Sequence, residues 1–518
     1  MKTKYVTFPT HERKILGLNG LNHDATASLI HGTEIKFAGH NERYSGIKFD
    51  EQLDSTLIND LKRYGDWDTS VWFEDSLLKK TRQLWAGQYS EVFTRKNIPN
   101  YYLKKNLGMY FQPDYQISHH LSHASAAYFT SPYDNAISVN IDAIGEWECA
   151  TIWYIETDSQ KRTTFTKLWS ESYPNSLGLW YSAMTQRLGL KPQEDEYILM
   201  GMAGWGEPIQ ELVKEMEEYF FANTSGLKMN HNLHRGCQDW NPKCYPDDGS
   251  DKWKFDIANA TQHICENRIM DIFQHASTLV PHCNNYVYGG GVALNCVANS
   301  LIARNFPNLW IIPNPGDGGS SLGSAAFVLG EHLDWNNTFL GYNAGIATTT
   351  GGYPIEQTLK ALLKGDLVGV ASGRAEFGPR ALGNRSLLAD PRGDDVKDKM
   401  NKIKKRQEFR PFAPAVLEEH AHKIFDMPVR KSQYMQFVAD CKRPDLYPAI
   451  CHVDNTSRVQ TVSKDDNPNF YNLINEFYKK TGCPMLLNTS LNIKGMPIVN
   501  THNDAVEFEK KYGVKVYG

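Results

Sequence analysis

Several features that the sequence lacks set the first limits on its function. None of its apolar runs approaches the roughly 20 residues that a membrane-crossing helix requires. The stretch from Met1 to Lys14 is polar, unlike a secretory signal. Its nine cysteines are an odd number scattered along the chain, which argues against a disulfide framework. We therefore expect a cytoplasmic protein with no membrane partner.

The chain also lacks an excess of charge of one sign. It carries 55 Lys and Arg against 59 Asp and Glu, so no overall basic field indicates a nucleic-acid-binding protein. A local basic groove stays open. The hydrophobic content of 41% indicates globular cores, and 518 residues are too many for one ordinary domain.

Strands that end in polar, glycine-containing turns alternate with helical segments, which predicts an α/β fold. Strands are expected at 15–19, 136–141, 150–155, 163–168, 286–288 and 309–312, with a hairpin at 28–37 and helices within 54–107. Small residues at 343–353 indicate a linker between a first domain at 1–345 and a second at 354–518. A helix at 355–364 and a strand at 367–371 open the second domain.

Two histidines and two aspartates are candidate metal ligands. His119 and His123 lie four residues apart in a segment rich in Ala and Ser, so a helix would place both on one face, where they can chelate one metal. A pair of ordinary surface or core histidines is the alternative. Asp142 closes an apolar strand and Asp317 lies in a Gly-rich turn; both suit a cation, although turn-capping Asp residues are common.

Glycines and arginines indicate anion or nucleotide binding. Gly290 and Gly291 follow a strand, where glycine lets backbone amides or a flat ring approach closely. Three arginines occur within twelve residues, from Arg374 to Arg385, beside Gly, Pro and Phe. Because arginine forks match phosphate oxygens, we expect a constructed anion pocket rather than a solvated surface.

Together these motifs resemble the NodU/CmcH family of O-carbamoyltransferases, including its tobramycin-type members. The resemblance runs from Gly17–Ser28 to Asn488–Ser490, and its most specific stretch is Glu376–Ser386. It implies an actin-like (ASKHA) transferase domain followed by a smaller YrdC-like α/β domain. In the family, the second domain joins carbamoyl phosphate to ATP, giving carbamoyladenylate and pyrophosphate. The first domain then transfers the carbamoyl group to an acceptor hydroxyl.

The resemblance also implies roles for individual residues, carried over motif by motif. A divalent metal, iron in characterised relatives, would be bound by His119, His123, Asp142 and Asp317. The adenosine would border Gly290, Gly291 and Asn295. Carbamoyl phosphate and the ATP phosphates, with Mg²⁺ offsetting their charge, would contact Arg380, Arg385, Lys404, Arg410, Arg458 and Ser490, with Lys405 as an alternative to Lys404.

The acceptor side of the site is expected at His23 and Asp24. We hypothesise that His23 takes the proton of the acceptor hydroxyl, the alternative being that it only hydrogen-bonds the substrate. The acceptor is a sugar or natural product, or a hydroxymethylated pyrimidine in a nucleotide or in DNA. The aromatic and basic insertion at 233–255 would suit base stacking, but a structured surface loop is favoured.

The sequence departs from the family pattern at two places. Ile198 replaces a Lys that many members carry, and Asn41 replaces the first Glu of a Glu-Glu-Arg motif. We expect these changes to affect the acceptor side more than the activation of carbamoyl phosphate. A threonylcarbamoyl-type transferase acting on tRNA, a sugar kinase and a non-catalytic nucleotide-binding module are the alternatives. The sequence leaves homo-oligomer formation open.

Overall fold

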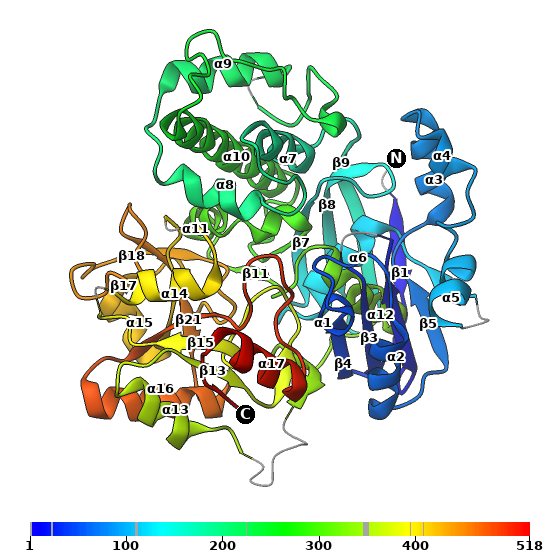
Figure 1. Cartoon of the computed structure of the whole chain (residues 1–518). Coiled ribbons are helices and arrows are strands. Elements are labelled where there is room, and N and C mark those ends of the chain that lie inside the picture. The colour runs from blue at the N-terminus through cyan, green and yellow to red at the C-terminus, as the bar shows by residue number, and fades with distance from the viewer. Residues whose placement is uncertain are drawn as a thin grey trace. The chain divides into compact units, whose positions relative to one another are not determined.

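The chain forms two compact units, and each contains a short stretch from elsewhere in the sequence. The computed structural model describes residues 3–21, 24–108, 112–223, 225–344, 352–393, 395–407 and 409–518. The first unit consists of residues 1–37 and 51–335, and the second of residues 38–50 and 336–518. Figure 1 shows the elements of both.

Two sheets form the frame of the first unit. The six-stranded sheet has the order β1-β9-β8-β7-β10-β11, and the five-stranded sheet has the order β4-β3-β2-β5-β6. Their strands are β1 (Lys4–Thr7), β2 (Lys14–Asn19), β3 (Thr26–His31), β4 (Glu34–His40), β5 (Thr69–Trp72), β6 (Tyr115–Gln116), β7 (Asn135–Ile141), β8 (Glu148–Thr157), β9 (Thr163–Ser172), β10 (Tyr286–Gly289) and β11 (Leu309–Ile311).

Two buried helices connect these sheets. Helix α6 (His119–Phe129) packs on β7 and β10 of one sheet, and α12 (Ser320–Leu329) packs on α6 and on β2 of the other. Glycine permits this close packing, because a Cβ on Gly323 would lie 2.0 Å from the carbonyl oxygen of Ser122. The helix that carries the two histidines is therefore held rigidly between the sheets.

The remaining helices of the first unit lie outside this frame. They are α2 (Ser55–Leu61), α3 (Ser76–Trp85), α4 (Tyr89–Val92), α5 (Pro99–Leu107), α7 (Leu177–Arg187), α8 (Glu196–Ala203), α9 (Gln210–Phe220), α10 (Asp251–Leu279) and α11 (Cys296–Asn305), with short 3₁₀ turns η1 (Lys62–Tyr64), η2 (Leu233–Arg235), η3 (Gly291–Leu294) and η4 (Asp317–Gly319). The helices expected within 54–107 are α2 to α5, and the same range also contains β5, a short buried strand that the helical periodicity did not predict.

In the insertion at 233–255, residues 233–250 fold as a structured loop against α7 and α9, and residues 251–255 begin helix α10. Trp240 and Trp253 are buried, and the guanidinium of Arg187 lies 4.7 Å from the Trp253 ring centroid. The Nζ atom of Lys252 lies 2.8 Å from Asp256. Because base stacking requires exposed rings, these inward-facing tryptophans favour the structural interpretation of the insertion.

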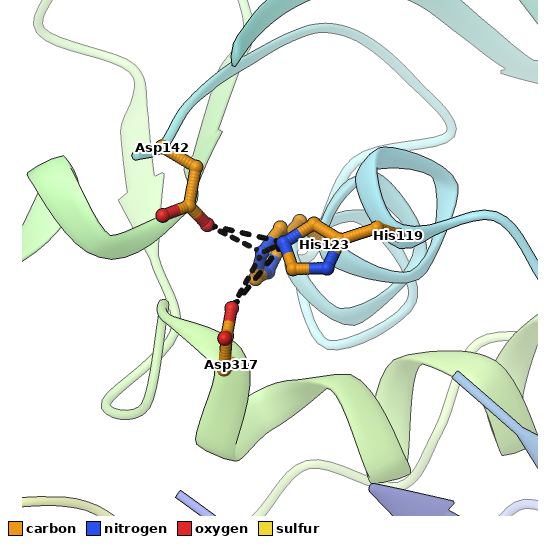
Figure 2. Close-up of side chains that lie close together, drawn as sticks. All are labelled: His119, His123, Asp142 and Asp317. Carbon is orange, nitrogen blue, oxygen red and sulfur yellow. Dashed lines mark hydrogen bonds and ion pairs between the residues drawn. The ribbon is translucent and has the colours of Figure 1, made fainter. Parts of the chain in front are cut away.

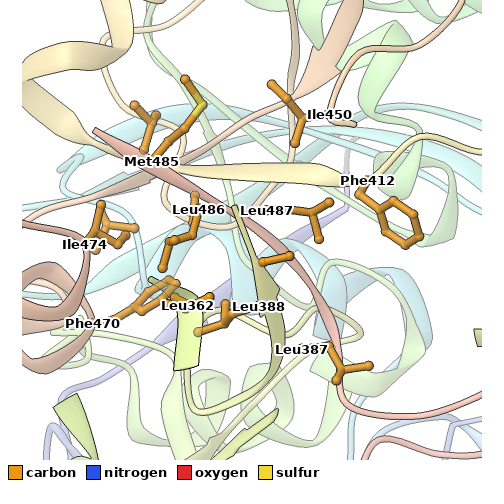
Figure 3. Packing of buried hydrophobic residues seen from close by; sticks show 14 of the residues in the cluster. Leu362, Leu387, Leu388, Phe412, Ile450, Phe470, Ile474, Met485, Leu486 and Leu487 are labelled. Carbon is orange, nitrogen blue, oxygen red and sulfur yellow. The ribbon is translucent and has the colours of Figure 1, made fainter. Parts of the chain in front are cut away.

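The second unit is built on a mixed six-stranded sheet of order β20-β16-β21-β15-β13-β22. Its strands are β13 (Val368–Ala371), β15 (Arg385–Ala389), β16 (Ala413–Leu417), β20 (Gln460–Val462), β21 (Met485–Ser490) and β22 (Val516–Tyr517). Figure 3 shows the apolar cluster beneath it, in which Leu387, Leu388, Phe470 and Leu486 are fully buried.

Smaller elements complete the second unit. They are β12 (Phe339–Asn343) paired with β14 (Arg374–Glu376), the sheet of β17 (Phe425–Asp426), β18 (Val438–Cys441) and β19 (Thr456–Arg458), and the helices α1 (Glu42–Ser45), α13 (Ile355–Leu362), α14 (Val396–Lys404), α15 (Glu418–Ile424), α16 (Pro468–Thr481) and α17 (His502–Tyr512). The structure thus confirms a mixed α/β architecture.

The observed unit boundaries differ from the expected ones. The second unit begins at residue 336, before the boundary expected at 345, because β12 pairs with β14 of that unit. Most of the linker expected at 343–353 lies outside the described residues. Residues 38–50 also belong to the second unit, which the sequence did not predict.

Two expectations from composition can be compared with the fold. All nine cysteines are free thiols, in agreement with the absence of a disulfide framework. None of the described helices combines the length and the apolar character that crossing a membrane requires.

Candidate active site

Three loops of the first unit meet at one edge of the six-stranded sheet. Strands β7, β10 and β11 run parallel, so their carboxyl ends lie at the same edge. Asp142 follows β7, Gly290 follows β10, and the loop after β11 leads to Asp317. The amide of Gly290 donates to the carbonyl of Pro315 at 2.8 Å, which ties two of these loops together.

The four candidate metal ligands converge at this edge, as Figure 2 shows. One potential ligand atom from each of His119, His123, Asp142 and Asp317 lies within 4.8 Å of every other. The Nε2 atoms of the two histidines are 3.0 Å apart. Asp142 Oδ2 lies 2.9 Å from His123 Nε2 and 3.3 Å from His119 Nε2, and Asp317 Oδ1 lies 3.3 Å from His119 Nε2.

This arrangement fits a divalent transition metal. Two nitrogens bound at about 2.1 Å and at right angles would lie about 3.0 Å apart, which is the spacing of the two Nε2 atoms. Two imidazoles and two carboxylates form a donor set that suits iron or zinc. The Nδ1 atoms of both histidines have no hydrogen-bond partner among the described residues, so the rings direct their Nε2 atoms inward.

The charges within the cluster are strongly coupled. Burial alone would lower the pKa of His119, but Asp317 and Asp142 outweigh it and raise that pKa well above its ordinary value. Burial and the neighbouring Asp317 would raise the pKa of Asp142, but hydrogen bonds from His119 and His123 hold it below its ordinary value. The carboxylates are therefore ionised and available as ligands.

Three other residues near the candidate ligands or expected beside the adenosine have contacts of their own. His120, between the two ligand histidines, turns its Nε2 atom to the carbonyl of Glu148 at 2.9 Å. Gly291 lies beside the cluster, since a Cβ there would be 3.1 Å from Asp142 Oδ1. The side chain of Asn295 instead caps α11 and exchanges hydrogen bonds with Gln262, so the structure gives it a structural role.

Of the two residues expected on the acceptor side, Asp24 is connected to the Asp317 loop. The side-chain amide nitrogen of Asn19, Nδ2, donates to the backbone carbonyl oxygens of Asp24 at 2.6 Å and Asp317 at 2.7 Å. Asn19 therefore joins the Asp24 loop to the metal-ligand loop. No spacing motif could have revealed this role, because a strand-ending Asn is common. His23 lies outside the described residues.

In the second unit, Lys404 and Ser490 meet as expected. The Lys404 ammonium donates to Ser490 O at 2.6 Å, to Ser490 Oγ at 3.1 Å and to Asn492 Oδ1 at 2.6 Å. Lys405 instead adopts a left-handed backbone, with its ammonium 5.9 Å from the Tyr512 ring centroid. The structure thus distinguishes two adjacent lysines that the sequence left as alternatives.

Lys404 lies in a concentration of positive charge. Burial lowers its pKa well below the ordinary lysine value, and Arg406, Arg410 and Lys48 lower it further. Crowded cations of this kind suit a bound anion, which would relieve their mutual repulsion. Lys48 was not predicted, because it belongs to the short segment 38–50 that the fold brings to this unit.

The contacts of Arg385 do not match its expected role as a phosphate ligand. Its side chain is fully buried, and its guanidinium donates to the carbonyl oxygens of Asn500, Ser372, Asn384, Tyr342 and Gly373. Burial lowers its pKa to about 10. Because these bonds use the five N–H donors of a guanidinium, none remains for phosphate. The structure therefore corrects the expectation for Arg385, which stabilises the unit.

A buried amide network connects the segments that carry the other predicted phosphate ligands. Asn488 donates to Ala381 O at 3.1 Å and to Gln460 Oε1 at 2.8 Å, and Gln460 donates to Leu382 O at 3.0 Å. These residues lie one or two positions from Arg380, Arg458 and Ser490. Arg458 Nε is buried without a hydrogen-bond partner among the described residues. The network thus links three short segments, each with a side chain that the sequence predicts to bind an anion.

The family-divergent motif at Asn41 also belongs to the second unit. Asn41 donates to Asp50 at 2.9 Å, and buried Arg43 donates to the carbonyl of Gly378 at 2.9 Å, within the arginine-rich segment. The motif therefore packs in the unit of the cation cluster, and the effect of this departure on the acceptor side stays a prediction. Ile198, the other departure, is buried in α8 of the first unit.

Comparisons with known proteins define the class. Residues 79–326 match the model of the carbamoyltransferase N-terminus, and residues 359–517 match that of the carbamoyltransferase C-terminus. The chain belongs to the carbamoyltransferase family, of the NodU/CmcH type, and is a transferase.

Several relatives are similar over much of the chain. An uncharacterized Synechocystis protein is 32% identical over 95% of this chain and 93% of its own length. Nodulation protein NolO of Bradyrhizobium diazoefficiens is 32% identical over 75% of each chain. The 3'-hydroxymethylcephem-O-carbamoyltransferase of Amycolatopsis lactamdurans is 34% identical over 45% of this chain and 48% of its own.

Proposed function

We propose that this protein is an ATP-dependent O-carbamoyltransferase that works in two steps. The second unit, as a YrdC-like domain, would activate carbamoyl phosphate. The first unit, as an actin-like domain, would pass the carbamoyl group to an acceptor hydroxyl. The main support for this proposal is the cluster of His119, His123, Asp142 and Asp317 in the first unit. Their potential ligand atoms lie close enough together to bind one metal ion, at the carboxyl edge of a sheet.

The first step joins two anions. Water divides carbamoyl phosphate into carbamate and phosphate, and the carbamate oxygen attacks the α-phosphorus of ATP, expelling pyrophosphate and forming carbamoyladenylate. The side chains of Lys404, Arg410, Arg380 and Arg458 would offset the repulsion, together with the Mg²⁺ that accompanies ATP. The crowding of Lys404 by Arg406, Arg410 and Lys48 supports this role.

The second step transfers the carbamoyl group to oxygen. A divalent metal, for which we favour Fe²⁺, would polarise the carbamoyl oxygen as a Lewis acid. His119, His123, Asp142 and Asp317 would hold it, and the glycine turn at Gly290 and Gly291, where a Cβ on Gly291 would crowd Asp142, would let the adenylate approach. The acceptor oxygen attacks the carbamoyl carbon, AMP leaves, and His23 takes the hydroxyl proton.

The acceptor is a hydroxyl on a sugar or natural product, or on a hydroxymethylated pyrimidine nucleotide or DNA base. The first class is supported by the cephem-modifying relative. The second class would gain support from exposed stacking residues, but the tryptophans of the 233–255 insertion are buried. We therefore place sugars and natural products first.

The proposal is tested by pyrophosphate release from ATP with and without carbamoyl phosphate, in the absence and presence of acceptors. Mass spectrometry on a panel of sugars, nucleosides and hydroxymethylated DNA then identifies the carbamoylated product. We expect release that depends on carbamoyl phosphate. No release with any acceptor would contradict the adenylate mechanism and favour a non-catalytic nucleotide-binding module. Threonylcarbamoylation of tRNA would favour the other alternative.

A further inference from the structure

One buried carboxylate joins the two halves of the metal-ligand set without belonging to it. Glu146 lies in the loop between β7 and β8, four residues after Asp142, and is 4% exposed. Its Oε1 atom accepts hydrogen bonds from the amide of His119 at 2.9 Å and from the amide of Asp75 at 2.8 Å. A single oxygen therefore connects the Asp142 loop to the first residue of helix α6.

The hydrogen bond from the His119 amide to Glu146 lies at the N-terminus of α6. The first amides of a helix have no partner inside the helix, and a side chain before the helix usually caps one of them. Ser118, the N-cap residue of α6, makes no such side-chain bond. Glu146 supplies the missing partner from another loop, and its negative charge is favourable at a helix N-terminus.

The loop around Glu146 is packed tightly against the same turn. A Cβ on Gly145 would lie 3.1 Å from His119 Cβ, and the Gly145 amide donates to the Glu148 carbonyl at 2.9 Å. The carbonyl of Glu146 itself accepts from Arg82 Nε at 3.2 Å. The loop has little freedom to shift, so the carboxylate fixes where α6 begins relative to Asp142.

We infer that Glu146 is a positioning residue that sets the alignment of the His119 and His123 imidazoles with Asp142 before any metal binds. This inference rests on the proposed function only for the metal site. Groups that orient ligands without touching the metal typically contribute about 10–100-fold to metal affinity. Glu146 acts through backbone hydrogen bonds, so its contribution is to geometry rather than to coordination.

The test is metal affinity of the full chain, measured independently of activity. Anaerobic Fe²⁺, and Zn²⁺ as a redox-inert probe, are titrated against a competing chromophoric chelator. We expect Glu146→Ala to weaken binding about 10–100-fold. Glu146→Gln keeps a carbonyl acceptor and should recover part of the loss, which a role in charge alone would not allow.

Glu148→Gln is the matched control. Glu148, two residues after Glu146, begins strand β8 and pairs its side chain with Lys167 at 2.5 Å. Its affinity should equal that of the wild type, and circular dichroism should show equal folding of all variants. Wild-type binding with unchanged affinity in Glu146→Ala would overturn this inference alone. Absence of stoichiometric binding by the wild type would overturn both the metal site and the inference.

Discussion

The two units bury charged side chains of different sign. In the first unit, two carboxylates and two imidazoles meet, and the acidic partners raise the pKa of His119 despite its burial. In the second unit, cations meet, and burial together with Arg406 and Arg410 lowers the pKa of Lys404. The first environment suits a cation and the second an anion, so each proposed step has its own electrostatic setting.

The two sites also use their fold differently. The metal-ligand residues follow strands of one parallel set or lie on a rigid helix, so regular structure orients them. The residues that we propose to bind anions lie on short segments that side-chain amides such as Asn488 and Gln460 connect. We therefore expect activity at the first site to be lost when a candidate ligand residue is replaced. Activity at the second site should fall also when a connecting residue such as Asn488 or Gln460 is replaced.

Removing a metal ligand should separate the two steps most clearly. His119→Ala is expected to reduce carbamoyl transfer by roughly 10²–10³-fold, because an electrophilic group at the reacting oxygen is lost. Pyrophosphate release that depends on carbamoyl phosphate should stay within about twofold of the wild type, since Lys404 and its neighbours are untouched. Equal loss of both activities would show that the two sites are not independent.

Two nearby arginines should respond in different ways. Arg385→Ala removes five hydrogen bonds to carbonyl oxygens and leaves a cavity at a fully buried position, so it should destabilise the protein by roughly 3 kcal/mol or more. Arg380→Ala should reduce pyrophosphate release roughly 10–100-fold and cost less stability than Arg385→Ala, because Arg380 is not fully buried. Urea unfolding and the release assay measure the two effects. A stable Arg385→Ala protein with lost release would restore the phosphate-binding role that the geometry denies it.

The lowered pKa of Lys404 predicts a pH dependence of anion binding. Between that lowered pKa and the ordinary lysine value of about 10.4, the free protein holds Lys404 partly neutral. A bound anion favours the protonated form, so binding takes up a proton and weakens as pH rises, by at most about tenfold per pH unit.

Calorimetry with carbamoyl phosphate in buffers of different ionisation enthalpy measures this proton uptake. Lys404→Met should abolish the uptake, whereas Lys405→Met, which removes a neighbouring cation near Tyr512, should retain it. The same uptake in both variants would assign the titration to another group.

The smallest effect is expected from the amide network. Gln460→Leu has a similar shape but removes the bonds to Leu382 and Asn488, at a cost of about 1–3 kcal/mol. We expect KM for carbamoyl phosphate to rise several-fold with little change in kcat, because Gln460 positions ligands without touching the reacting atoms. A change confined to kcat would contradict this supporting role.

The sequence alone determined the fold class and much of the metal-ligand set. Alternating apolar strands predicted the α/β fold; the expected strands overlap β2, β7, β8, β9, β10, β11 and β13, and the expected hairpin overlaps β3 and β4. His119 and His123 were found because helical spacing places them on one face, and Asp142 and Asp317 because they end strands or turns. The resemblance to the family combined these residues, which spacing could not do.

Only the tertiary structure decided which polar side chains remain for a ligand. Arg380 and Arg385 lie five residues apart in one motif, yet two of the carbonyls that Arg385 binds, those of Tyr342 and Asn500, come from distant parts of the sequence. Lys404 and Lys405 are adjacent, but the fold directs one to Ser490 and the other to Tyr512. Hydrogen-bond partners and burial are long-range properties, so no local pattern could assign these roles, nor those of Glu146, Asn19 and Gln460.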